Sequence, residues 1–254
     1  MNGGSGKLRL DLALVERQLV ESRGKAQALI LAGKVSVDGQ KSDKPGRLIT
    51  TENEIAVEQP LPFVSRGGVK LEKAIQHFGI DVSGKICMDV GTSTGGFTDC
   101  LLQHGAERVH AVDTGAGQID WKLRTDPRVI LHERTNARHL TFDTIGELVD
   151  IIACDVSFIS VTLLIGALAP ILKPNGDWFI LIKPQFEAGR EAVGKGGIVR
   201  DGAAHAAACE KVASALHTAG FATAVTDSPI LGAEGNREFL LHAHRGTVTG
   251  LLYS

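Results

Sequence analysis

Residues 88–97 of this chain of 254 residues read Met-Asp-Val-Gly-Thr-Ser-Thr-Gly-Gly-Phe. The apolar residues before Gly91 predict a strand over 85–90, and the residues after Gly95 predict a helix that ends at Gly105. Between the two, glycine allows a tight turn and a close approach of the backbone to a ligand. A strand, a glycine-rich turn and a helix in this order indicate an α/β fold with a ligand site at the end of the strand.

Three kinds of site fit this turn. A dinucleotide site has the pattern Gly-x-Gly-x-x-Gly, but Ser93 stands in the place of the second glycine. A nucleophile elbow, Gly-x-Ser-x-Gly, matches residues 91–95, but such an elbow follows several strands, and only a small domain and one helix precede this turn. The third kind is an S-adenosylmethionine (SAM) loop, in which an acid stands two residues before the first glycine, as Asp89 does.

Two carboxylates bear on this choice. Asp113 ends the next predicted strand, where a carboxylate can accept both ribose hydroxyls of a nucleoside cofactor. NAD would suit Asp113 equally well, and a strand-end Asp can also cap its own turn. Asp89 favours SAM, because a carboxylate beside the turn repels a pyrophosphate but suits the cationic methionine end of SAM.

The rest of the body alternates strands and helices. Short apolar strands are predicted at 85–90, 108–113, 129–133, 150–155 and 178–183, and two closing strands at 223–226 and 238–244. Helices are predicted near 68–78, 95–104, 161–172 and 203–219. This alternation predicts a mostly parallel sheet that is covered on both faces and ends in an antiparallel hairpin.

The first 60 residues have a different pattern. Apolar residues at helical spacing predict a helix over 10–20, and Ser22 is placed to cap a second helix that runs to Leu31 and ends at Gly33. Residues 34–40 alternate and turn at Asp-Gly, which predicts a hairpin, and 53–57 predicts another strand. We therefore expect a small α+β domain over 1–59 with a flexible leader at 1–7, a linker at 60–64, and a second domain over 65–254.

Composition limits the classes of protein. Hydrophobic residues make up 43% and charged residues 22% of the chain, as in ordinary soluble proteins, and the net charge is −2. The small domain is basic and the body slightly acidic. Four scattered cysteines without a Cys-x-x-Cys pair indicate reduced thiols. The uncharged stretch 156–172 is too short to span a membrane, so we expect a buried strand end and a core helix there.

Four polar residues fall where an open α/β sheet builds its sites. These are Asp155 and Lys183 at the ends of two strands, Glu238 at the start of the last strand, and Lys70 in the helix before the first body strand. Each has an ordinary explanation as a charge that reaches water. Lys183 is less ordinary, because it follows five largely apolar residues, and a buried ammonium group is costly unless it is paired.

The small domain resembles the alpha-L RNA-binding motif found in a ribosomal protein, in pseudouridine synthases and in some RNA methyltransferases. The resemblance covers residues 8–58 and rests on the order of elements and on the run Ser22-Arg23-x-Lys25-Ala26-x-x-Leu29-Ile30-x-x-Gly33-Lys34-Val35-x-Val37-Asp38-Gly39. It implies that a basic surface meets RNA phosphates, with Arg23, Lys25, Lys34, Lys41 and Lys44 as the contacting residues. The alternative is that these are solvated faces of a small domain.

Nearly the whole chain resembles the hemolysin-A (TlyA) type of ribosomal RNA 2′-O-methyltransferase, within the broader FtsJ-like superfamily. The motifs that carry this are Ser-Arg-Gly at 65–67, Asp-Val-Gly-x-Ser-x-Gly-Gly-Phe-Thr at 89–98, Glu-Arg-Thr-Asn-Ala-Arg at 133–138, Asp-Val-Ser-Phe-Ile-Ser at 155–160, Lys-Pro-Gln-Phe-Glu at 183–187 and Gly-Asn-x-Glu at 235–238. The resemblance implies a Rossmann-like SAM-dependent methyltransferase with a mostly parallel seven-stranded sheet and no metal. The implied partners are ribosomal RNA or ribosomal subunits in the cytoplasm, and no membrane.

The resemblance also assigns site residues. The family's Lys-Asp-Lys-Glu tetrad carries over to the catalytic residues Lys70, Asp155, Lys183 and Glu238. The residues expected to bind the cofactor are Asp89, Gly91, Ser93, Gly95, Gly96, Phe97, Asp113, Asn136 and Asp155. Arg66 joins the residues expected to bind RNA.

The implied reaction is methylation of ribose 2′-hydroxyls, with cytidines as targets. A 2′-hydroxyl is a poor nucleophile, so Lys183 would accept its proton or stabilise the developing alkoxide, while the two carboxylates orient and balance the lysines. Spacing does not say which lysine titrates. Two other classes of protein stay open: a non-catalytic RNA-binding or ribosome-assembly protein, and a membrane-active hemolysin.

Two weaker patterns lie in the carboxyl-terminal third of the chain. The glycine-rich stretch 189–197 follows the Lys183 strand and predicts either a mobile loop over the site or a plain surface loop. His242 and His244 share one face of a strand, which is a weak pattern for a metal pair.

Overall fold

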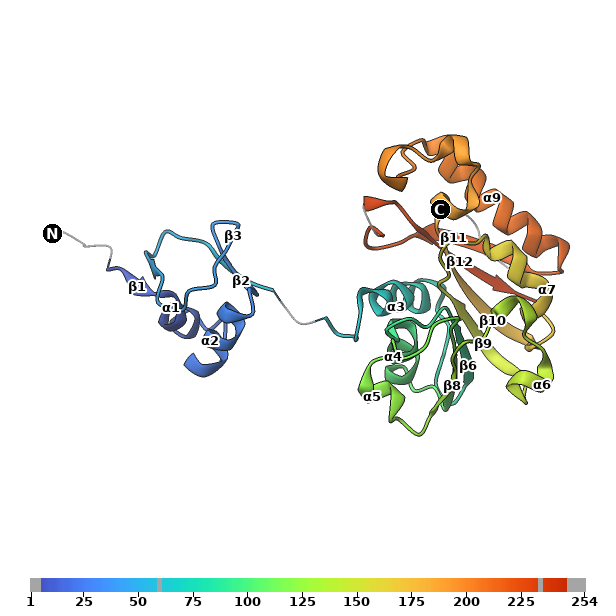
Figure 1. The fold of residues 1–254 in the computed structure, drawn as a ribbon, viewed down its shortest axis with the longest axis horizontal. Coiled ribbons are helices and arrows are strands. Elements are labelled where there is room, and N and C mark those ends of the chain that lie inside the picture. The colour runs from blue at the N-terminus through green and yellow to red at the C-terminus, as the bar shows by residue number, and fades with distance from the viewer. Residues whose placement is uncertain (1–5, 59–60, 233–234, 246–254) are drawn as a thin grey trace. The chain divides into compact units, whose positions relative to one another are not determined.

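The chain divides into two compact units, Met1–Leu61 and Pro62–Ser254, and each is considered by itself (Figure 1). The structure, a computed structural model, describes residues 6–58, 61–232 and 235–245. Most of the predicted leader and the first residue of the predicted linker lie outside this part of the chain. Phe63, which the sequence assigns to the linker, is buried in a core of the larger unit.

The smaller unit is an α+β fold. Its elements are β1 (Leu8–Arg9), α1 (Leu10–Glu16), α2 (Arg23–Leu31), β2 (Val35–Val37), β3 (Gln40–Lys41), β4 (Leu48–Ile49) and β5 (Ile55–Val57). Strands β3, β2 and β5 form an antiparallel sheet in that order, and β1 pairs with β4. The two helices and the sheet share a small apolar core.

Local sequence explains the elements of this unit. The Ser22 hydroxyl accepts the Lys25 backbone N–H at 3.3 Å and so caps α2, as predicted. The hairpin turns at Asp38 and Gly39, whose φ values of 52° and 76° match a two-residue hairpin loop. The first helix ends at Glu16, earlier than predicted, because Gln18 takes a left-handed conformation with φ of 57°.

The larger unit alternates helices and strands around one sheet (Figure 1). Up to the fourth strand of the sheet it contains α3 (Arg66–Phe78), β6 (Ile86–Val90), α4 (Gly96–Gln103), β7 (Arg108–Val112), α5 (Trp121–Arg124), β8 (Val129–His132), η1 (Ala137–His139), α6 (Phe142–Ile145) and β9 (Val149–Cys154). The remaining elements are η2 (Val161–Leu164), α7 (Ile165–Leu168), β10 (Leu172–Ile182), α8 (Pro184–Glu187), η3 (Arg190–Ala192), η4 (Lys195–Gly197), α9 (Gly202–Thr218), β11 (Ala222–Asp227) and β12 (Phe239–His244).

The sheet has seven strands in the order β11-β12-β10-β9-β6-β7-β8. Strands β8, β7, β6, β9 and β10 run parallel, and β12 runs antiparallel to both β10 and β11. The register places Val112, Val90 and Cys154 side by side at the ends of their strands. The residues that follow these three strands therefore meet at one edge of the sheet, as the sequence pattern predicts.

Each face of the sheet has its own apolar core. Helices α3 and α4 cover one face, where Leu71 and Leu101 pack with Phe179 of β10. Helices α7 and α9 cover the other face, where Leu168 and Val212 pack with Trp178. Adjacent residues of one strand thus enter opposite cores, because side chains alternate along a strand.

The region after β9 differs from the prediction. Instead of one helix over 161–172, the chain forms the short turns η2 and α7 and then enters β10 at Leu172. Pro170 explains the early end, because proline cannot continue a helix. Strand β10 therefore begins six residues before the predicted strand at 178–183. Its pairing with β9 shifts register between Leu172 and Asp177.

Candidate active site

A cavity of about 610 Å³ opens at the carboxyl ends of the parallel strands in the larger unit. Its walls come mainly from the start of α3, the turn after β6, the loop after β9, the residues after β10 and the residues that lead into β12. Open α/β sheets bind ligands at this edge, because the loops that leave parallel strands converge there. The cavity is therefore the candidate active site.

Lys183 and Asp155 form an ion pair in this cavity. The Lys183 Nζ lies 2.6 Å from the Asp155 Oδ1, and the two side chains are 12% and 22% exposed. The pair follows from the fold: Asp155 comes directly after β9, and Lys183 comes directly after its parallel neighbour β10. The Lys183 Nζ also donates to the Ser157 hydroxyl at 2.8 Å.

Lys70 and Glu238 form a second ion pair that lines the same cavity. The Lys70 Nζ lies 2.6 Å from the Glu238 Oε2, and the side chains are only 9% and 2% exposed. Lys70 comes from α3 and Glu238 directly precedes β12, which are 168 residues apart. The four residues expected to form the catalytic tetrad are thus brought together as two lysine–carboxylate pairs.

The glycine-rich turn after β6 brings the strand ends close together. Gly91 has a φ of 88°, and a side chain at this position would collide with the carbonyl group of Asp155. Gly95 has a φ of 96°, and a side chain there would collide with Leu123 of α5. Ser93, in the place of a glycine, also has a positive φ, 51°. Gly91, Ser93, Gly96 and Phe97 line the cavity.

Asp113 lies in a second, narrow cavity beside the same turn. Its two carboxylate oxygens accept the backbone N–H groups of Ser93 at 2.7 Å and Gly115 at 2.6 Å. Asp113 therefore does cap its own turn, one of the alternatives that the sequence leaves open. Each oxygen keeps a further lone pair, so the carboxylate can still accept hydroxyl hydrogens.

Asp89 is placed differently from the prediction. Its side chain is completely buried and lines neither cavity, because it points under the first turn of α4. There its Oδ2 accepts the backbone N–H and the hydroxyl of Thr98, at 3.0 and 2.7 Å. Burial raises the pKa of Asp89 to about 7. Asp89 thus anchors the helix after the glycine turn and offers no exposed charge to a ligand.

Asn136 also lines neither cavity. Its side-chain oxygen accepts the backbone N–H of Arg138 at 3.1 Å and so caps the short helix η1. An Asn just before a helical turn is a common cap, and this local role accounts for its position. The structure therefore does not bring Asn136 to the predicted cofactor site.

Sequence reasoning did not single out two residues of the cavity wall, Phe158 and Phe186. Phe158 has a positive φ of 68° and is 88% exposed, and its ring lies 5.2 Å from that of Phe186, centroid to centroid. An exposed aromatic residue in a rare backbone conformation is typical of functional loops. Phe158 lies three residues after Asp155, and Phe186 lies three residues after Lys183. An aromatic residue so close to a strand-end charge is the sequence feature that could have identified both.

Glu187 anchors the loop that follows β9. Its carboxylate accepts the Ser160 hydroxyl at 2.5 Å and the Val161 backbone N–H at 2.7 Å, and it pairs with Lys211 of α9 at 3.1 Å. Glu187 is itself buried at the end of α8, four residues after Lys183. The two loops that carry Asp155 and Lys183 are therefore tied to each other.

The glycine-rich stretch 189–197 forms the short turns η3 and η4, and Val193 and Gly197 reach the cavity wall. Asn236 holds this stretch from the other side: its side chain donates to the Gly197 carbonyl group at 3.0 Å and accepts the Val199 N–H at 3.1 Å. The stretch thus lies over the site, as one of the two predictions has it. Its mobility stays a prediction.

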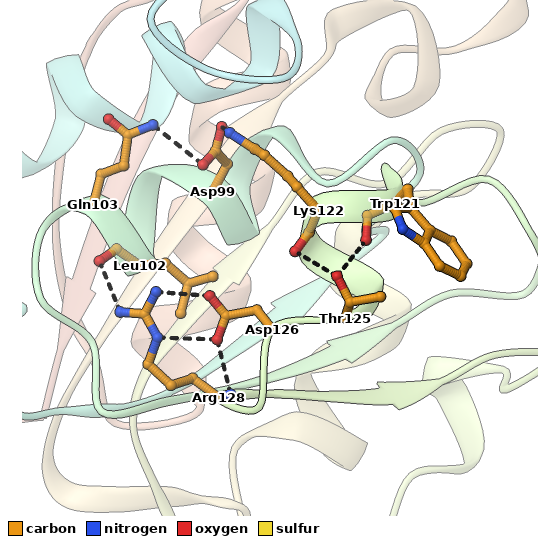
Figure 2. A network of polar contacts seen from close by, with 8 residues as sticks. All are labelled: Asp99, Leu102, Gln103, Trp121, Lys122, Thr125, Asp126 and Arg128. Carbon is orange, nitrogen blue, oxygen red and sulfur yellow. Dashed lines mark hydrogen bonds and ion pairs between the residues drawn. The ribbon is translucent and has the colours of Figure 1, made fainter.

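Helix α5 is fixed by a polar network around Asp99 of α4 (Figure 2). The Asp99 Oδ2 accepts the Lys122 ammonium at 3.0 Å and the Val64 backbone N–H at 2.8 Å, and Gln103 donates to the Oδ1 at 3.1 Å. Because Leu123 of the same short helix packs against Gly95, this network supports the glycine turn from outside.

In the smaller unit, most of the basic residues expected to bind RNA have acidic partners. Lys25 pairs with Glu21 at 3.0 Å and Lys34 with Glu58 at 2.7 Å, and all four side chains are exposed. Within residues 6–58, no ion pair is formed by Lys41 or Lys44. Exposed pairs contribute little stability, so RNA phosphates can replace the carboxylates.

Arg23 is held by a buried carboxylate that sequence reasoning missed. The Asp11 carboxylate accepts Arg9 through two nitrogens and Arg23 through Nε, each at 3.0 Å. The hydrogen bonds from Arg9 hold the pKa of Asp11 well below its usual range. An acid among the apolar residues of α1 is the signal that could have found it.

Three further observations concern metal ligands, thiols and membrane spans in the described part of the chain. His242 and His244 both contact the Asp177 Oδ1, at 2.8 and 3.1 Å, and the described residues contain no group of three side chains suited to a metal ion. All four cysteines are free, and burial raises the pKa of each thiol. A search of the described residues found no helix with the length and apolar character needed to cross a bilayer.

The fold and the site define a class of protein. A mostly parallel seven-stranded sheet with one reversed strand, and a glycine turn after the strand β6, are features of Rossmann-like methyltransferases. A solved structure from Listeria monocytogenes, described as a candidate SAM-dependent methyltransferase, has this fold: the TM-score is 0.52 at 16% identity, over 72% of this chain and 100% of that chain.

The chain belongs to the FtsJ-like methyltransferase family, which matches residues 63–245, and an S4 domain matches residues 8–55. It is 43% identical over 238 residues to the 16S/23S rRNA (cytidine-2′-O)-methyltransferase TlyA of Mycobacterium tuberculosis, covering 92% of this chain and 89% of that protein. It is 45% identical to Hemolysin A of Brachyspira hyodysenteriae, covering 92% of this chain and 99% of that protein. The family predicted from the sequence is thereby confirmed.

A solved structure from Streptococcus thermophilus, described as a candidate hemolysin, is similar over most of its length. The TM-score is 0.73 at 42% sequence identity, and the match covers 96% of this chain and 90% of that chain. The similarity therefore extends through both units of the chain and not only through the methyltransferase fold.

Proposed function

We propose that this chain is a cytoplasmic enzyme that transfers the methyl group of SAM to ribose 2′-hydroxyls of ribosomal RNA, with cytidines as targets and ribosomal subunits as partners. The observation that carries the proposal is the pair of lysine–carboxylate contacts, Lys183–Asp155 and Lys70–Glu238, in one cavity beside the glycine turn. The names of the similar TlyA enzymes support the ribose and cytidine specificity.

The residues around the glycine turn fit SAM. Asp113 would accept the ribose hydroxyls with its remaining lone pairs, and the large cavity has room for the methionine end beside Gly91 and Ser93. The narrow cavity at Asp113 has a volume of about 10 Å³, enough for about one water molecule. Gly115 and Gln118 line this narrow cavity and would lie beside the adenosine half.

SAM, when bound, supplies an activated methyl group. The residues of this chain prepare the acceptor. Lys183 holds the 2′-hydroxyl and either takes its proton on Nζ or donates to the oxygen as negative charge develops there. In the first case the oxygen keeps the electron pair with which it takes up the methyl group. Asp155 keeps Lys183 in place. In the buried pair, the Lys70 ammonium and the Glu238 carboxylate neutralise each other in the cavity wall.

The RNA would be held at two places. The smaller unit offers to phosphates Lys41 and Lys44, which form no ion pair within residues 6–58, and the paired arginines and lysines. Arg66 lines the cavity, where it can meet the phosphate of the target nucleotide. The exposed ring of Phe158 beside Phe186 offers a face on which the target base can stack.

A transfer experiment tests the proposal. Purified 30S and 50S subunits that lack 2′-O-methylation are incubated with the protein and tritium-labelled SAM, and the rRNA is then hydrolysed with alkali. A 2′-O-methyl group blocks cleavage of its own phosphodiester bond, so the proposal predicts label in alkali-stable dinucleotides. Label in mononucleotides would indicate base methylation, and the absence of label despite SAM binding would exclude these substrates.

The similarity to Hemolysin A makes membrane lysis the second candidate function. The test is leakage of a dye from phospholipid vesicles at micromolar protein. We expect no leakage above that caused by an unrelated protein, whereas leakage that persists in a variant without methyl transfer would establish lysis as a separate activity.

A further inference from the structure

We infer that Ser157 is a positioning residue for Lys183, a role that rests on the proposed function and adds a fifth residue to the two ion pairs. The Lys183 Nζ donates to the Ser157 hydroxyl at 2.8 Å, and both side chains line the cavity. Ser157 is exposed to the cavity, so its hydroxyl is not needed to satisfy a buried group of the core.

The hydrogen bond to Ser157 fixes the direction of the Lys183 amine. A lysine nitrogen is tetrahedral, with one bond to carbon and three other positions. Ser157 occupies one of these at 2.8 Å, and the Asp155 carboxylate lies 2.6 Å from the nitrogen as its ion-pair partner. Among the residues that the structure describes, these are the polar partners of Lys183. The positions that Ser157 leaves open are therefore the ones that can meet the 2′-hydroxyl.

This arrangement works in both protonation states of the lysine. In the ammonium form an open position carries a hydrogen, which can donate to the 2′-oxygen. In the neutral form one hydrogen stays on Ser157, and the lone pair can take an open position, where it can accept the hydroxyl proton. With Asp155 alone, the amine could rotate about its carbon bond, and the reactive position would not be fixed.

The loop of Ser157 is held so that this contact persists. Its start is fixed where the Asp155 backbone N–H donates to the Val90 carbonyl group at 2.9 Å. Its end is fixed by Glu187, which holds Ser160 and Val161 and lies four residues after Lys183. Glu187 thus ties the end of the Ser157 loop to the short helix α8, which directly follows Lys183. This connection limits how far the Ser157 hydroxyl and the Lys183 amine can separate.

Amine labelling tests the contact without any methyl transfer. The protein is treated with a trace of isotope-labelled acetic anhydride, and peptide mass spectrometry gives the labelling of Lys183 relative to Lys173, whose amine pairs with Asp150 at 2.8 Å and serves as internal reference. Removal of the hydroxyl in Ser157→Ala should raise this ratio about threefold, because the amine loses one of its two partners. Ser157→Thr keeps a hydroxyl and should keep the ratio.

Kinetics with saturating SAM then test the consequence. Ser157→Ala should lower kcat about 10-fold, which corresponds to about 1.4 kcal/mol, and leave the KM values for SAM and RNA within about twofold. Ser157→Thr should restore most of kcat. The matched control is Ser214→Ala on α9, which also removes a serine hydroxyl but lines neither cavity and should behave as wild type.

The two readouts keep this inference apart from the proposed function. An unchanged labelling ratio in Ser157→Ala overturns the inference, whatever happens to kcat. A raised ratio together with a lower kcat supports it, and a raised ratio with unchanged kcat overturns it. If the wild type methylates neither subunit, the proposed function fails, and the labelling ratio alone decides whether Ser157 positions the amine.

Discussion

The two lysine–carboxylate pairs of the cavity have the same separation of 2.6 Å but different surroundings. In the pair Lys183–Asp155 the carboxylate is 22% exposed, and both residues end parallel strands that lie side by side. In the pair Lys70–Glu238 the carboxylate is 2% exposed, and the residues come from a helix and from the position just before the reversed strand. Both pairs line the cavity, but the carboxylate of Lys183–Asp155 is the more open of the two.

This difference in exposure indicates that the two ion pairs have different roles. An amine that reacts with a hydroxyl must be reached by the substrate, and Lys183 with its Ser157 contact meets that condition. A buried ion pair reacts poorly but holds a fixed dipole in the cavity wall, where the low dielectric strengthens its field. We therefore assign proton handling to the open pair and electrostatic support to the buried pair.

The largest expected effect is the loss of methyl transfer in Lys183→Met. Removal of the group that takes the proton or stabilises the oxygen should reduce transfer by about 1,000-fold or more. The variant should still fold and bind SAM, because Lys183 lines the cavity and belongs to no apolar core. Single-turnover transfer measures the rate, and calorimetry measures SAM affinity. Turnover near the wild-type rate would remove Lys183 from the chemistry.

The next effect concerns stability and separates the two pairs. Glu238→Gln leaves the buried Lys70 ammonium without a counter-charge and should lower the free energy of unfolding by about 3–5 kcal/mol. Asp155→Asn removes a carboxylate that is 22% exposed, where water can partly replace it, and should lower the free energy of unfolding by less than Glu238→Gln does. Urea unfolding measures both. Equal losses in the two variants would contradict the different roles assigned to the pairs.

A double variant controls for this prediction. Lys70→Met combined with Glu238→Leu replaces the whole buried pair by apolar side chains, which often restores or increases stability. We expect the double variant to regain most of the stability lost in Glu238→Gln and still to transfer methyl groups slowly, because the dipole of the ion pair is gone. Full activity in the double variant would show that the buried pair is only structural.

Asp89 extends the comparison to a carboxylate with no lysine beside it. Burial raises its pKa from 3.8 to about 7, so the folded protein binds its proton more tightly than the unfolded chain does. The contribution of Asp89 to stability should therefore fall as the pH rises from about 4 to about 7 and level off above that. In this window the carboxylate loses its proton inside an apolar environment.

The variant Asp89→Asn tests this pH dependence. The fall in stability with pH that Asp89 causes should be absent in this variant. The free energy of unfolding of the variant minus that of the wild type should therefore rise between pH 5 and pH 8. The amide oxygen can still accept the Thr98 contacts, which keeps the helix anchor. Thermal unfolding across this pH range measures the difference. A constant difference between variant and wild type would mean that Asp89 is not protonated in the folded state.

The smallest expected effect lies in the smaller unit, where paired and unpaired lysines can be compared in the same way. Lys41→Ala with Lys44→Ala should weaken rRNA binding a few-fold and lower the slope of log K against log salt by about 2. Lys25→Ala with Lys34→Ala also frees Glu21 and Glu58 and should weaken binding more by repulsion. Filter binding at several salt concentrations measures both. Unchanged slopes would assign these lysines to solvated faces only.

Much of the fold and of the site could be predicted from the sequence. The strands around Asp113, Asp155 and Lys183 are short apolar runs bounded by polar residues, and the parallel order follows from their alternation with helices. Because the ends of parallel strands meet at one edge, residues far apart in the sequence could be placed in one site before the structure was known.

The rest depended on side-chain directions and short elements that a pattern does not contain. Asp89 lies one residue before Val90 on a strand buried on both faces, so alternation could not say that it points under α4 instead of into the cavity. Helices such as α5 and α8, with four residues each, are too short for a periodic pattern. The Ser157 contact depends on a loop conformation, with a left-handed Phe158, that no residue type specifies.

Nucleoside mass spectrometry of rRNA from 30S and 50S subunits, incubated with SAM and either the wild type or Lys183→Met, tests the role of the open lysine pair. We expect 2′-O-methylcytidine with the wild type and none with the variant, although both bind SAM equally well. Methylation of a base, or 2′-O-methylcytidine formed equally by the variant, would show that this lysine pair does not act on a ribose hydroxyl.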